Sequence, residues 1–166
     1  MYRYTGDVYD RIWSPCELSS DWRRLNTSLN SDDLVQGEYK LPITVMSTAV
    51  TPLNASAPLQ IQWNADNVND QFHVFLHFNE VEKLTRNETR EINITSKTRV
   101  NEYDIHIYRK ESTYWKRYFT GATRYHISLT KTENSTLPPI LNAFEIYKAK
   151  DFSQSETDQH DGKLVL

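Results

Sequence analysis

Two pairs of side chains have the types and spacings found in reactive sites, and the first is a pair of histidines. His73 and His77 lie four residues apart, which on a helix would place two zinc ligands on one face. Val74 stands where such a motif carries its glutamate. Apolar and polar residues alternate through this segment, which predicts a strand and separates the two histidines by about 13 Å. We therefore expect no metal site here.

The second pair is Glu80 and Glu82. Carboxylates two residues apart on a strand are separated by roughly 7 Å, which lies within the range of about 6.5–9.5 Å for inverting glycosidases. Such neighbours are also common on solvated surfaces, and no Gly-x-Ser-x-Gly motif occurs. The glycines do not form a phosphate-binding loop; they are Gly6, Gly37, Gly121 and Gly162. The sequence predicts that the chain is not an enzyme and binds no cofactor.

A third chemical feature is an excess of acceptor sites for N-linked glycans. Five Asn-x-Ser/Thr triplets occur, where the composition predicts about two by chance. Transfer to such asparagines takes place in the secretory lumen and at exposed backbone, so the excess predicts a domain that faces outward from the cell. The alternative is that these are ordinary polar loop triplets. The predicted glycosylation sites are Asn26, Asn54, Asn87, Asn93 and Asn134.

Composition narrows the classes of partner. A chain of 166 residues suits one domain with its own core. The net charge of −3 and the isoelectric point near 5.9 provide no basic field for nucleic acid or an anionic membrane. No apolar run has the length of a membrane span, and residues 1–13 lack the apolar core of a signal peptide. We expect no membrane insertion by this segment and interpret it as an excerpt of a longer secreted or membrane-anchored protein.

Cys16 is the single cysteine of the chain. An internal disulfide and a cysteine-based zinc site are therefore excluded. Because an unpaired thiol behaves as a small apolar group in protein interiors, we predict that Cys16 is buried rather than paired outside the chain.

Aromatic side chains are the best candidates for ligand contact. Tyr and Trp rings pack against the apolar faces of sugars, while amides and carboxylates bind the sugar hydroxyl groups. The same mixture of Tyr and Arg suits a protein interface, and many of these rings must also fill the core. The candidate cluster is Tyr103, Tyr108, Tyr114, Trp115, Tyr118 and Phe119.

β-Strands are the elements that must position these residues, because apolar residues recur with period two and no stretch has the pattern of a three-turn amphipathic helix. The most apolar segment, 71–81, is predicted to be a central strand. Phe144 and Ile146 are predicted to be core residues of the last strand. Many short strands without interleaved helices predict an all-β fold, a jelly-roll-like β-sandwich. We expect the domain to span residues 1–152, with 153–166 as a polar linker or truncated tail.

Two segments resemble the plant malectin-like domain. Residues 7–13 read DVYDRIW and residues 131–147 read KTENSTLPPILNAFEIY, of which the run from Leu137 to Ala143 is quite specific. The resemblance covers most of residues 7–158. It is closest to the second of two malectin-like modules that precede the repeats in plant leucine-rich-repeat receptor-like kinases. Supporting pieces are residues 46–52, 54–58, 71–81 and 87–94.

This resemblance implies a β-sandwich of carbohydrate-binding ancestry on the extracellular face of the plasma membrane, as part of a single-pass receptor with a cytosolic kinase. No ligand-binding residue is carried over from the family, so the ligand site is unknown at this stage. Residues 99–120 depart from the family pattern, either as a divergent loop with its own ligand or through an error in the gene model. Residues 162–166 depart as a truncated reading frame would.

Three hypotheses about function follow. The leading one is a non-catalytic extracellular recognition module whose ligand is a cell-wall oligosaccharide. The alternative is a module that binds a peptide or a co-receptor ectodomain and no sugar, because five glycans would leave one bare face for a protein partner. The third is a truncated, non-functional remnant, since half of a module pair would expose apolar surface.

Overall fold

The computed structural model describes residues 1–17, 19–27, 39–98, 102–108 and 114–150. Within these ranges almost every element is a strand, which confirms the predicted all-β class, and the one helix is a single turn. In chain order the elements are β1 (Tyr2–Arg3), β2 (Ile12–Trp13), β3 (Trp22–Asn26), α1 (Ile43–Met46), β4 (Thr48–Pro52), β5 (Leu59–Asn64), β6 (Phe72–His77), β7 (Ile92–Thr98), β8 (Glu102–Tyr108), β9 (Tyr114–Phe119), β10 (Arg124–Lys131) and β11 (Ala143–Lys148).

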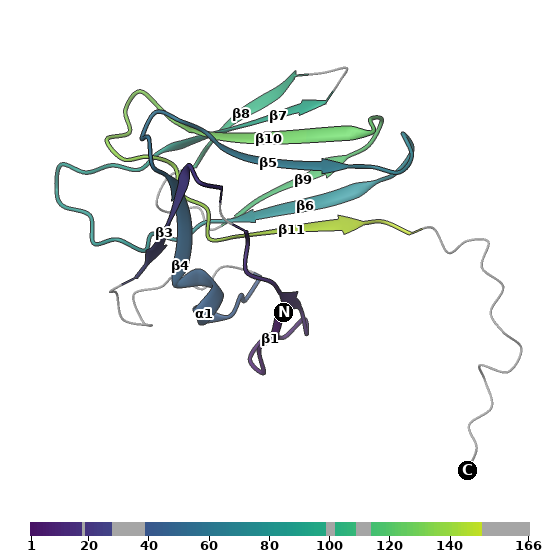
Figure 1. Ribbon diagram of the computed structural model, residues 1–166, viewed down its shortest axis with the longest axis horizontal. Coiled ribbons are helices and arrows are strands. Elements are labelled where there is room, and N and C mark those ends of the chain that lie inside the picture. The colour runs from purple at the N-terminus through teal and green to yellow at the C-terminus, as the bar shows by residue number, and fades with distance from the viewer. Residues whose placement is uncertain (18, 28–38, 99–101, 109–113, 151–166) are drawn as a thin grey trace, which may run out of the picture.

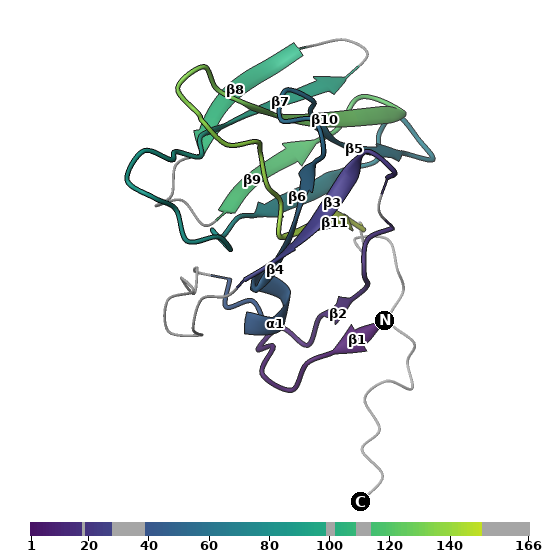
Figure 2. The same cartoon turned by 60° about the vertical axis from the view of Figure 1, so that its left-hand side comes forward.

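Two antiparallel sheets form the body of the domain (Figure 1). The first has the strand order β5-β10-β7-β8 and the second has the order β11-β6-β9. β6 is the central strand of its sheet, as predicted for segment 71–81. β5 and β11 are edge strands on the same side of the sandwich, while β8 and β9 lie together on the opposite side (Figure 2).

The core lies where the inward faces of the two sheets meet. Ile92 and Ile94 on β7, and Val74 and Leu76 on β6, have at most 1% of their surface exposed. Asn93, between the two isoleucines, is half-buried on the outer face, which is where the alternation of Ile92, Asn93 and Ile94 along a strand predicts it. Burial of each large apolar side chain contributes about 1.5–3 kcal/mol, and a shift of one residue would expose the whole set. The alternation therefore fixes the register of the strands.

A short ribbon and the N-terminal segment close one end of the sandwich (Figure 2). β3 pairs with β4 over five positions, and Val50 in β4 exchanges backbone hydrogen bonds with Leu141, just before β11. Trp13 in β2 packs against a separate apolar cluster that contains Leu41 and Met46. The same cluster includes Ala143 of β11, so this N-terminal segment lies beside β11 although it belongs to neither main sheet.

Two predictions of burial are wrong. Phe144 is not a core residue, because β11 is an edge strand and this ring lies beside an open cleft with 37% of its surface exposed. Ile146, which shares that face of β11, does pack against the core. Cys16 is exposed, because it lies in the irregular segment between β2 and β3, outside both apolar clusters.

The divergent stretch 99–120 contributes to both sheets. β8 pairs with β7, and β9 pairs with β6 over six positions from Phe72 to His77. Trp115 and Phe119 on β9 are part of the core. Residues 99–101, 109–113 and 151–166 lie outside the described residues, so the domain boundary at 152 and the nature of the tail stay predictions.

Candidate ligand-binding cleft

A cleft of about 1880 Å³ opens between the edge strands β5 and β11. Residues from β3, β4 and the segment 2–21 close it at one end. The cleft exists because, among the described strands, β5 pairs only with β10 and β11 only with β6. Its volume exceeds the roughly 300–1,000 Å³ typical of small-molecule pockets, so it has room for a ligand of several sugar or amino-acid units.

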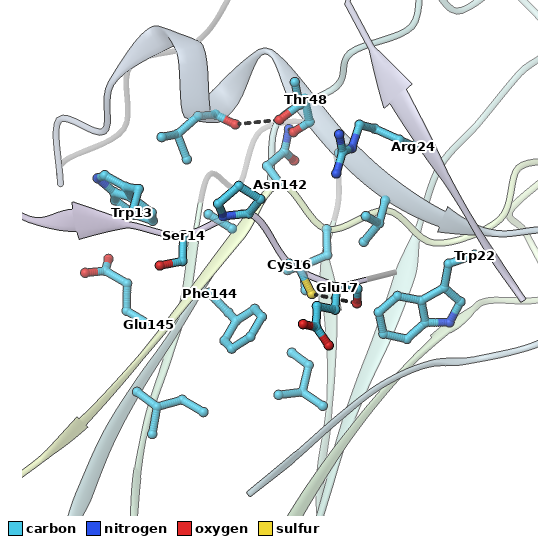
Figure 3. Close-up of a pocket in the computed structure, with 18 of the residues that line it drawn as sticks. Trp13, Ser14, Cys16, Glu17, Trp22, Arg24, Thr48, Asn142, Phe144 and Glu145 are labelled. Atoms are coloured by element: carbon cyan, nitrogen blue, oxygen red, sulfur yellow. Dashed lines mark hydrogen bonds between the residues drawn. The ribbon is translucent and has the colours of Figure 1, made fainter. Parts of the chain in front are cut away.

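Aromatic rings and polar side chains share the lining of this cleft. Phe144 presents its ring from β11 and the half-buried Trp22 from β3, with Glu17 drawn between them in Figure 3. Arg24 and Gln60 add a guanidinium group and an amide. Rings supply apolar faces, and charged or amide groups supply hydrogen-bond partners for hydroxyl or peptide groups. This combination suits a polar ligand that also has apolar faces.

The N-terminal wall of the cleft is held by a buried ion pair within residues 7–13. Nε of Arg11 donates to both carboxylate oxygens of Asp7 at 2.9 Å, and Nε1 of Trp13 donates to the same carboxylate at 2.8 Å. The guanidinium group of Arg11 also stacks over the Trp13 ring, 5.2 Å from its centroid. Asp10 has a positive φ of 49°, which turns the chain between β1 and β2.

These contacts control the ionisation of Asp7. Burial raises the pKa of this carboxyl group, but hydrogen bonds from Arg11, Trp13 and the backbone N–H of Tyr9 outweigh burial and hold the pKa below its ordinary value. The charged form of Asp7 is therefore the form that holds the wall in place.

Glu145 joins this wall to β11. Its Oε1 atom hydrogen-bonds Nε2 of His77 at 2.7 Å and lies 3.4 Å from Nη1 of Arg11, and the hydroxyl group of Tyr147 donates to its other oxygen. Burial raises the pKa of Glu145, but the hydrogen bonds from His77 and Tyr147 and the charge of Arg11 lower it overall. Burial and the bond to Glu145 raise the pKa of Tyr147. The motif at 7–13 thus anchors one wall of the cleft, and its residues from Tyr9 to Trp13 also line the cleft.

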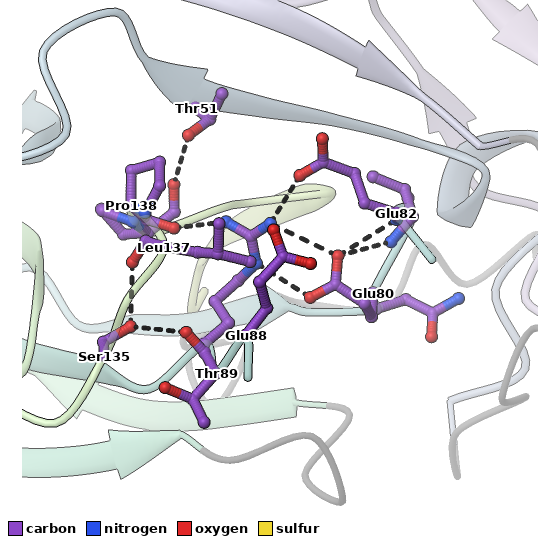
Figure 4. Close-up of polar contacts among 12 residues, drawn as sticks. Thr51, Glu80, Glu82, Glu88, Thr89, Ser135, Leu137 and Pro138 are labelled. Carbon is purple, nitrogen blue, oxygen red and sulfur yellow. Dashed lines mark hydrogen bonds and ion pairs between the residues drawn. The ribbon is translucent and has the colours of Figure 1, made fainter. Parts of the chain in front are cut away.

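The glutamate pair with glycosidase-like spacing forms ion pairs with a single arginine (Figure 4). Nε of Arg90 donates to Glu80 at 2.8 Å and Nη2 donates to Glu82 at 2.6 Å, while Nη1 donates to the carbonyl oxygen of Pro138. The side chain of Arg90 is only 2% exposed, so the two carboxylates are needed to balance its buried charge. The pair therefore fixes a loop, and its arrangement provides no free acid and base.

The closing motif at 137–143 also fixes backbone. Thr51 donates its hydroxyl hydrogen to the carbonyl oxygen of Pro139 at 2.9 Å. Nδ2 of Asn142 donates to the carbonyl oxygens of Met46 and Thr48 at 3.0 and 2.9 Å. Both segments that carry the family resemblance therefore include structural connections between loops and sheets.

The two histidines of the predicted pair lie in different environments. His73 is exposed on the outer face of β6, whereas His77 is 1% exposed and bonded to Glu145. Within the described ranges, no group of three or more His, Cys, Asp or Glu side chains is arranged to hold a metal ion. The same part of the chain has no helix of the length and apolarity that a bilayer crossing requires.

The residues of the predicted aromatic cluster also differ in burial and do not form one surface. Trp115 and Phe119 are buried in the core, Tyr114 is half-buried, and Tyr118 is 45% exposed on the outer face of the second sheet. None of these four lines the cleft. The side chains outside the described part are those of Tyr103 and Tyr108.

Trp22 and Phe144 are two of the rings that line the cleft, and neither was predicted as a ligand contact from the sequence. Phe144 alternates with Ile146 as a core residue would, and Trp22 lies in a five-residue strand that pairs outside the main sheets. Phe144 is exposed because β11 lies at the edge of its sheet. That edge position can be recognised only once the strand order is known.

The predicted glycosylation sites occupy two parts of the surface. Asn26 and Asn54 are exposed and line the cleft. Asn87 and Asn134 are exposed in turns away from it, and Asn93 is half-buried on β7. Asn54, Asn87 and Asn134 lie in turns or bends, as the polar, turn-like sequence around each of them predicts.

Comparison with known proteins identifies relatives of the whole described region. The model of the Malectin-like domain matches residues 1–149. A probable leucine-rich-repeat receptor-like protein kinase of Arabidopsis thaliana is 36% identical over 167 residues, which cover 96% of this chain and 18% of that protein. A probable LRR receptor-like serine/threonine-protein kinase of the same plant is 40% identical over 172 residues, covering 98% and 19%. The chain thus spans about a fifth of the length of these relatives.

Solved structures show the same fold. The extracellular domain of ANXUR1 from Arabidopsis thaliana superimposes with a TM-score of 0.61 at 16% identity, covering 81% of this chain and 40% of that one. A chain from the complex of the plant peptide RALF23 with FER and LLG2 superimposes with a TM-score of 0.54 at 17% identity, covering 75% and 38%.

Proposed function

We propose that this chain, which belongs to the malectin-like domain family, is an extracellular recognition module of a plant leucine-rich-repeat receptor-like kinase. Its proposed ligand is a cell-wall oligosaccharide that binds in the cleft between β5 and β11. The module spans residues 1–152 in this proposal, and its role is binding rather than catalysis. The observation that carries the proposal is the exposed ring of Phe144 beside polar groups in an open cleft.

The physical argument concerns the ring and its polar neighbours together. An exposed phenylalanine on an edge strand loses favourable burial unless a partner covers it. A pyranose ring has an apolar face that covers such a ring and equatorial hydroxyl groups that need donors and acceptors. Arg24, Glu17 and Gln60 provide those donors and acceptors around the same cleft.

The location outside the cell is supported independently of the cleft. Relatives at 36–40% identity are receptor-like kinases, and a neighbour of the same fold is an extracellular domain. Four of the five predicted glycan acceptors are exposed asparagines. As part of a receptor, the module would lie on the outer face of the plasma membrane.

A direct test is binding of the folded chain to an array of plant cell-wall oligosaccharides, followed by calorimetry with the best binder. We expect Phe144→Ala to weaken that affinity about tenfold or more, a loss of about 1.4 kcal/mol. Tyr118→Ala is the matched control, because Tyr118 is similarly exposed but lies outside the cleft. An absence of binding across the array, or equal losses in both variants, would contradict the proposal.

A second candidate ligand is an extended peptide. β5 and β11 each leave one backbone edge unpaired among the described strands, and extended peptides bind such edges by adding a strand. One chain of the same fold was solved with the peptide RALF23 and LLG2. Main-chain hydrogen bonds dominate strand addition, so peptide binding would survive Phe144→Ala better than sugar binding would.

A further inference from the structure

We infer that folding divides the glycan acceptors of this chain into two classes: Asn54 stays open to N-glycan transfer after folding, whereas Asn87, Asn93 and Asn134 accept glycans only before their loops and strand have docked. The relevance of this division in the cell depends on the proposed extracellular function. Its physical basis is the set of hydrogen bonds that the acceptor triplets make in the folded chain.

The transfer reaction sets the requirement. The side-chain Nδ2 atom of asparagine forms a bond to the anomeric carbon of a lipid-diphosphate oligosaccharide, the bond from that carbon to the diphosphate oxygen breaks, and the amide loses one proton to the released diphosphate. The transferring enzyme must grip the triplet as exposed, extended chain, including the hydroxyl group two residues after the asparagine. A triplet whose backbone and hydroxyl group are already bonded inside the fold cannot be gripped.

Asn54 meets this requirement in the folded chain. It lies in the exposed turn between β4 and β5, and its triplet partners Ala55 and Ser56 are also exposed. Oδ1 of Asn54 accepts the backbone N–H of Ser56 at 3.0 Å, and the backbone carbonyl oxygen of Asn54 accepts the N–H of Ala57 at 2.9 Å. Both bonds lie within one exposed turn, so the triplet can become extended without separating two segments of the fold, and Nδ2 is left free. Within the described residues, the hydroxyl group of Ser56 makes no hydrogen bond.

The triplets at Asn87 and Asn134 are held together by hydrogen bonds between them. The hydroxyl group of Thr89, which belongs to the first triplet, donates to the carbonyl oxygen of Asn134 at 2.8 Å. The hydroxyl group of Thr136, which belongs to the second, accepts the backbone N–H of Thr89 at 2.9 Å and donates to the Thr89 carbonyl oxygen at 3.3 Å. Each triplet thus uses its hydroxyl group to hold the backbone of the other.

The backbone reinforces these bonds between the triplets. The N–H groups of Thr136 and Leu137 both donate to the carbonyl oxygen of Thr89, at 3.0 and 3.1 Å. Ser135 is 4% exposed, and its hydroxyl group accepts the N–H of Glu91 at 3.0 Å. The same hydroxyl group lies 2.8 Å from the carbonyl oxygen of Leu137 and 3.2 Å from that of Thr89, as acceptors of its hydrogen (Figure 4). Neither triplet can be drawn into an enzyme without separating the two loops.

Asn93 is closed for a different reason. It lies in β7, which pairs with β10 on one side and β8 on the other, opposite Thr130 and Ile107. The triplet hydroxyl group, on Thr95, donates to the carbonyl oxygen of Ser128 at 3.4 Å. Access requires removal of a central strand from the sheet. The triplet at Asn26 includes residue 28, which lies outside the described residues, and it is left unassigned.

The division is tested with purified enzyme and no ligand. Unglycosylated 1–166 from bacteria is incubated with a single-subunit eukaryotic oligosaccharyltransferase and its lipid-linked donor, once folded and once after unfolding in urea and dilution directly into the reaction. Mass mapping of each asparagine then gives its occupancy. We expect Asn54 to be modified to a similar extent in both samples. Asn87, Asn93 and Asn134 should be modified at least tenfold less in the folded sample.

A variant isolates the bonds between the two loops. Ser135→Ala preserves both triplets but removes the bonds of the Ser135 hydroxyl group to Glu91, Leu137 and Thr89. In the folded variant, occupancy at Asn87 and Asn134 should rise while that at Asn93 stays low.

Comparable modification of Asn54 and Asn134 in the folded wild-type chain would overturn the inference, as would modification of Asn54 only after unfolding. Neither outcome depends on sugar binding in the cleft. If no ligand were found, the two classes of glycan acceptor could still be correct. If the two classes were wrong, the proposed sugar binding would be unaffected.

Discussion

Two arginines, the half-buried Arg11 and the buried Arg90, bind pairs of carboxylates in chemically similar ways but in different regions of the domain. Arg11 binds the carboxylates of Asp7 and Glu145, and Arg90 binds those of Glu80 and Glu82. Each also donates to backbone carbonyl oxygens in a segment distant in sequence. Both lie in or beside segments that resemble the family most clearly.

The difference is what else holds each region. The loop around Arg90 is also fixed by backbone hydrogen bonds between Thr89 and residues 136 and 137, so the arginine completes a network inside the sandwich. The segment around Arg11 belongs to neither main sheet and depends on side chains, chiefly Arg11, Asp7 and Trp13, for its position. The Arg90 network therefore stabilises the sandwich, whereas the Arg11 network holds the wall that shapes the cleft.

The largest expected effect is on stability at Arg90. Arg90→Met leaves Glu80, whose side chain is 10% exposed, without its partner, and breaking such a buried pair costs about 3–5 kcal/mol. Urea denaturation should show that loss in the free energy of unfolding. Arg86→Met is the control, because Arg86 is exposed in the same loop and should change stability by less than about 0.5 kcal/mol. Equal losses of unfolding free energy in the two variants would contradict a special role of Arg90 in stability.

A smaller global effect with a local signature is expected at Arg11. Arg11→Met should lower the free energy of unfolding by about 2 kcal/mol, because residues 1–17 can detach without opening the sheets. Hydrogen exchange should accelerate in residues 7–13 while β6 and β10 keep their protection. The exposed pair of Arg3 with Asp10 offers a control, since Arg3→Met should change little. If hydrogen exchange accelerated equally in residues 7–13 and in β10, the N-terminal wall would not detach independently of the sheets.

Acid should act on the same wall. Asp7 and Glu145 have folded-state pKa values below their ordinary ones, so each contributes stability that is present above the unfolded pKa of about 4 and is lost as the pH falls through the lower folded pKa. Stability should therefore decline below about pH 5. Asp7→Asn should flatten that decline when unfolding is measured between pH 7 and pH 3. An unchanged slope would show that Asp7 is not linked to folding.

The smallest effect is expected at Cys16. Cys16 is exposed as a residue, while partial desolvation of its sulfur atom and the nearby charge of Glu17 raise the pKa of the thiol, which makes it a poor nucleophile near neutral pH. Cys16→Ser should change the unfolding free energy by less than about 0.5 kcal/mol. A thermal melt of the two proteins side by side tests this. A loss above 1.5 kcal/mol would restore the prediction, made from the sequence, that this residue is buried.

The sheets were predictable because alternation is a local property. Ile92 and Ile94 face inward and Asn93 outward wherever β7 pairs, so the pattern alone places them. Strand order is not local, and it decided the position of Phe144. The alternation of Phe144 with Ile146 predicts burial, but the edge position of β11 places its first ring in the open cleft.

The chemistry of the charged residues was harder to predict for the same reason. Glu80 and Glu82 have a catalytic spacing in sequence, and only the fold brings Arg90 between them. His77 has the sequence spacing of a metal ligand with His73, and only the pairing of β6 with β11 places it against Glu145. Short motifs in this chain identified the family, and parts of both motifs line the cleft. The motifs alone do not show that β11 is an edge strand, which is what opens the cleft.

The most direct test of the central claim is hydrogen exchange of the folded chain with and without the best-binding cell-wall oligosaccharide. The account predicts slower exchange in residues 11–17, 22–26 and 142–147, which border the cleft, and no change in residues 85–91 and 132–137 around Arg90. Slower exchange in residues 116–119 on the outer face of the second sheet, with none at the cleft, would contradict it.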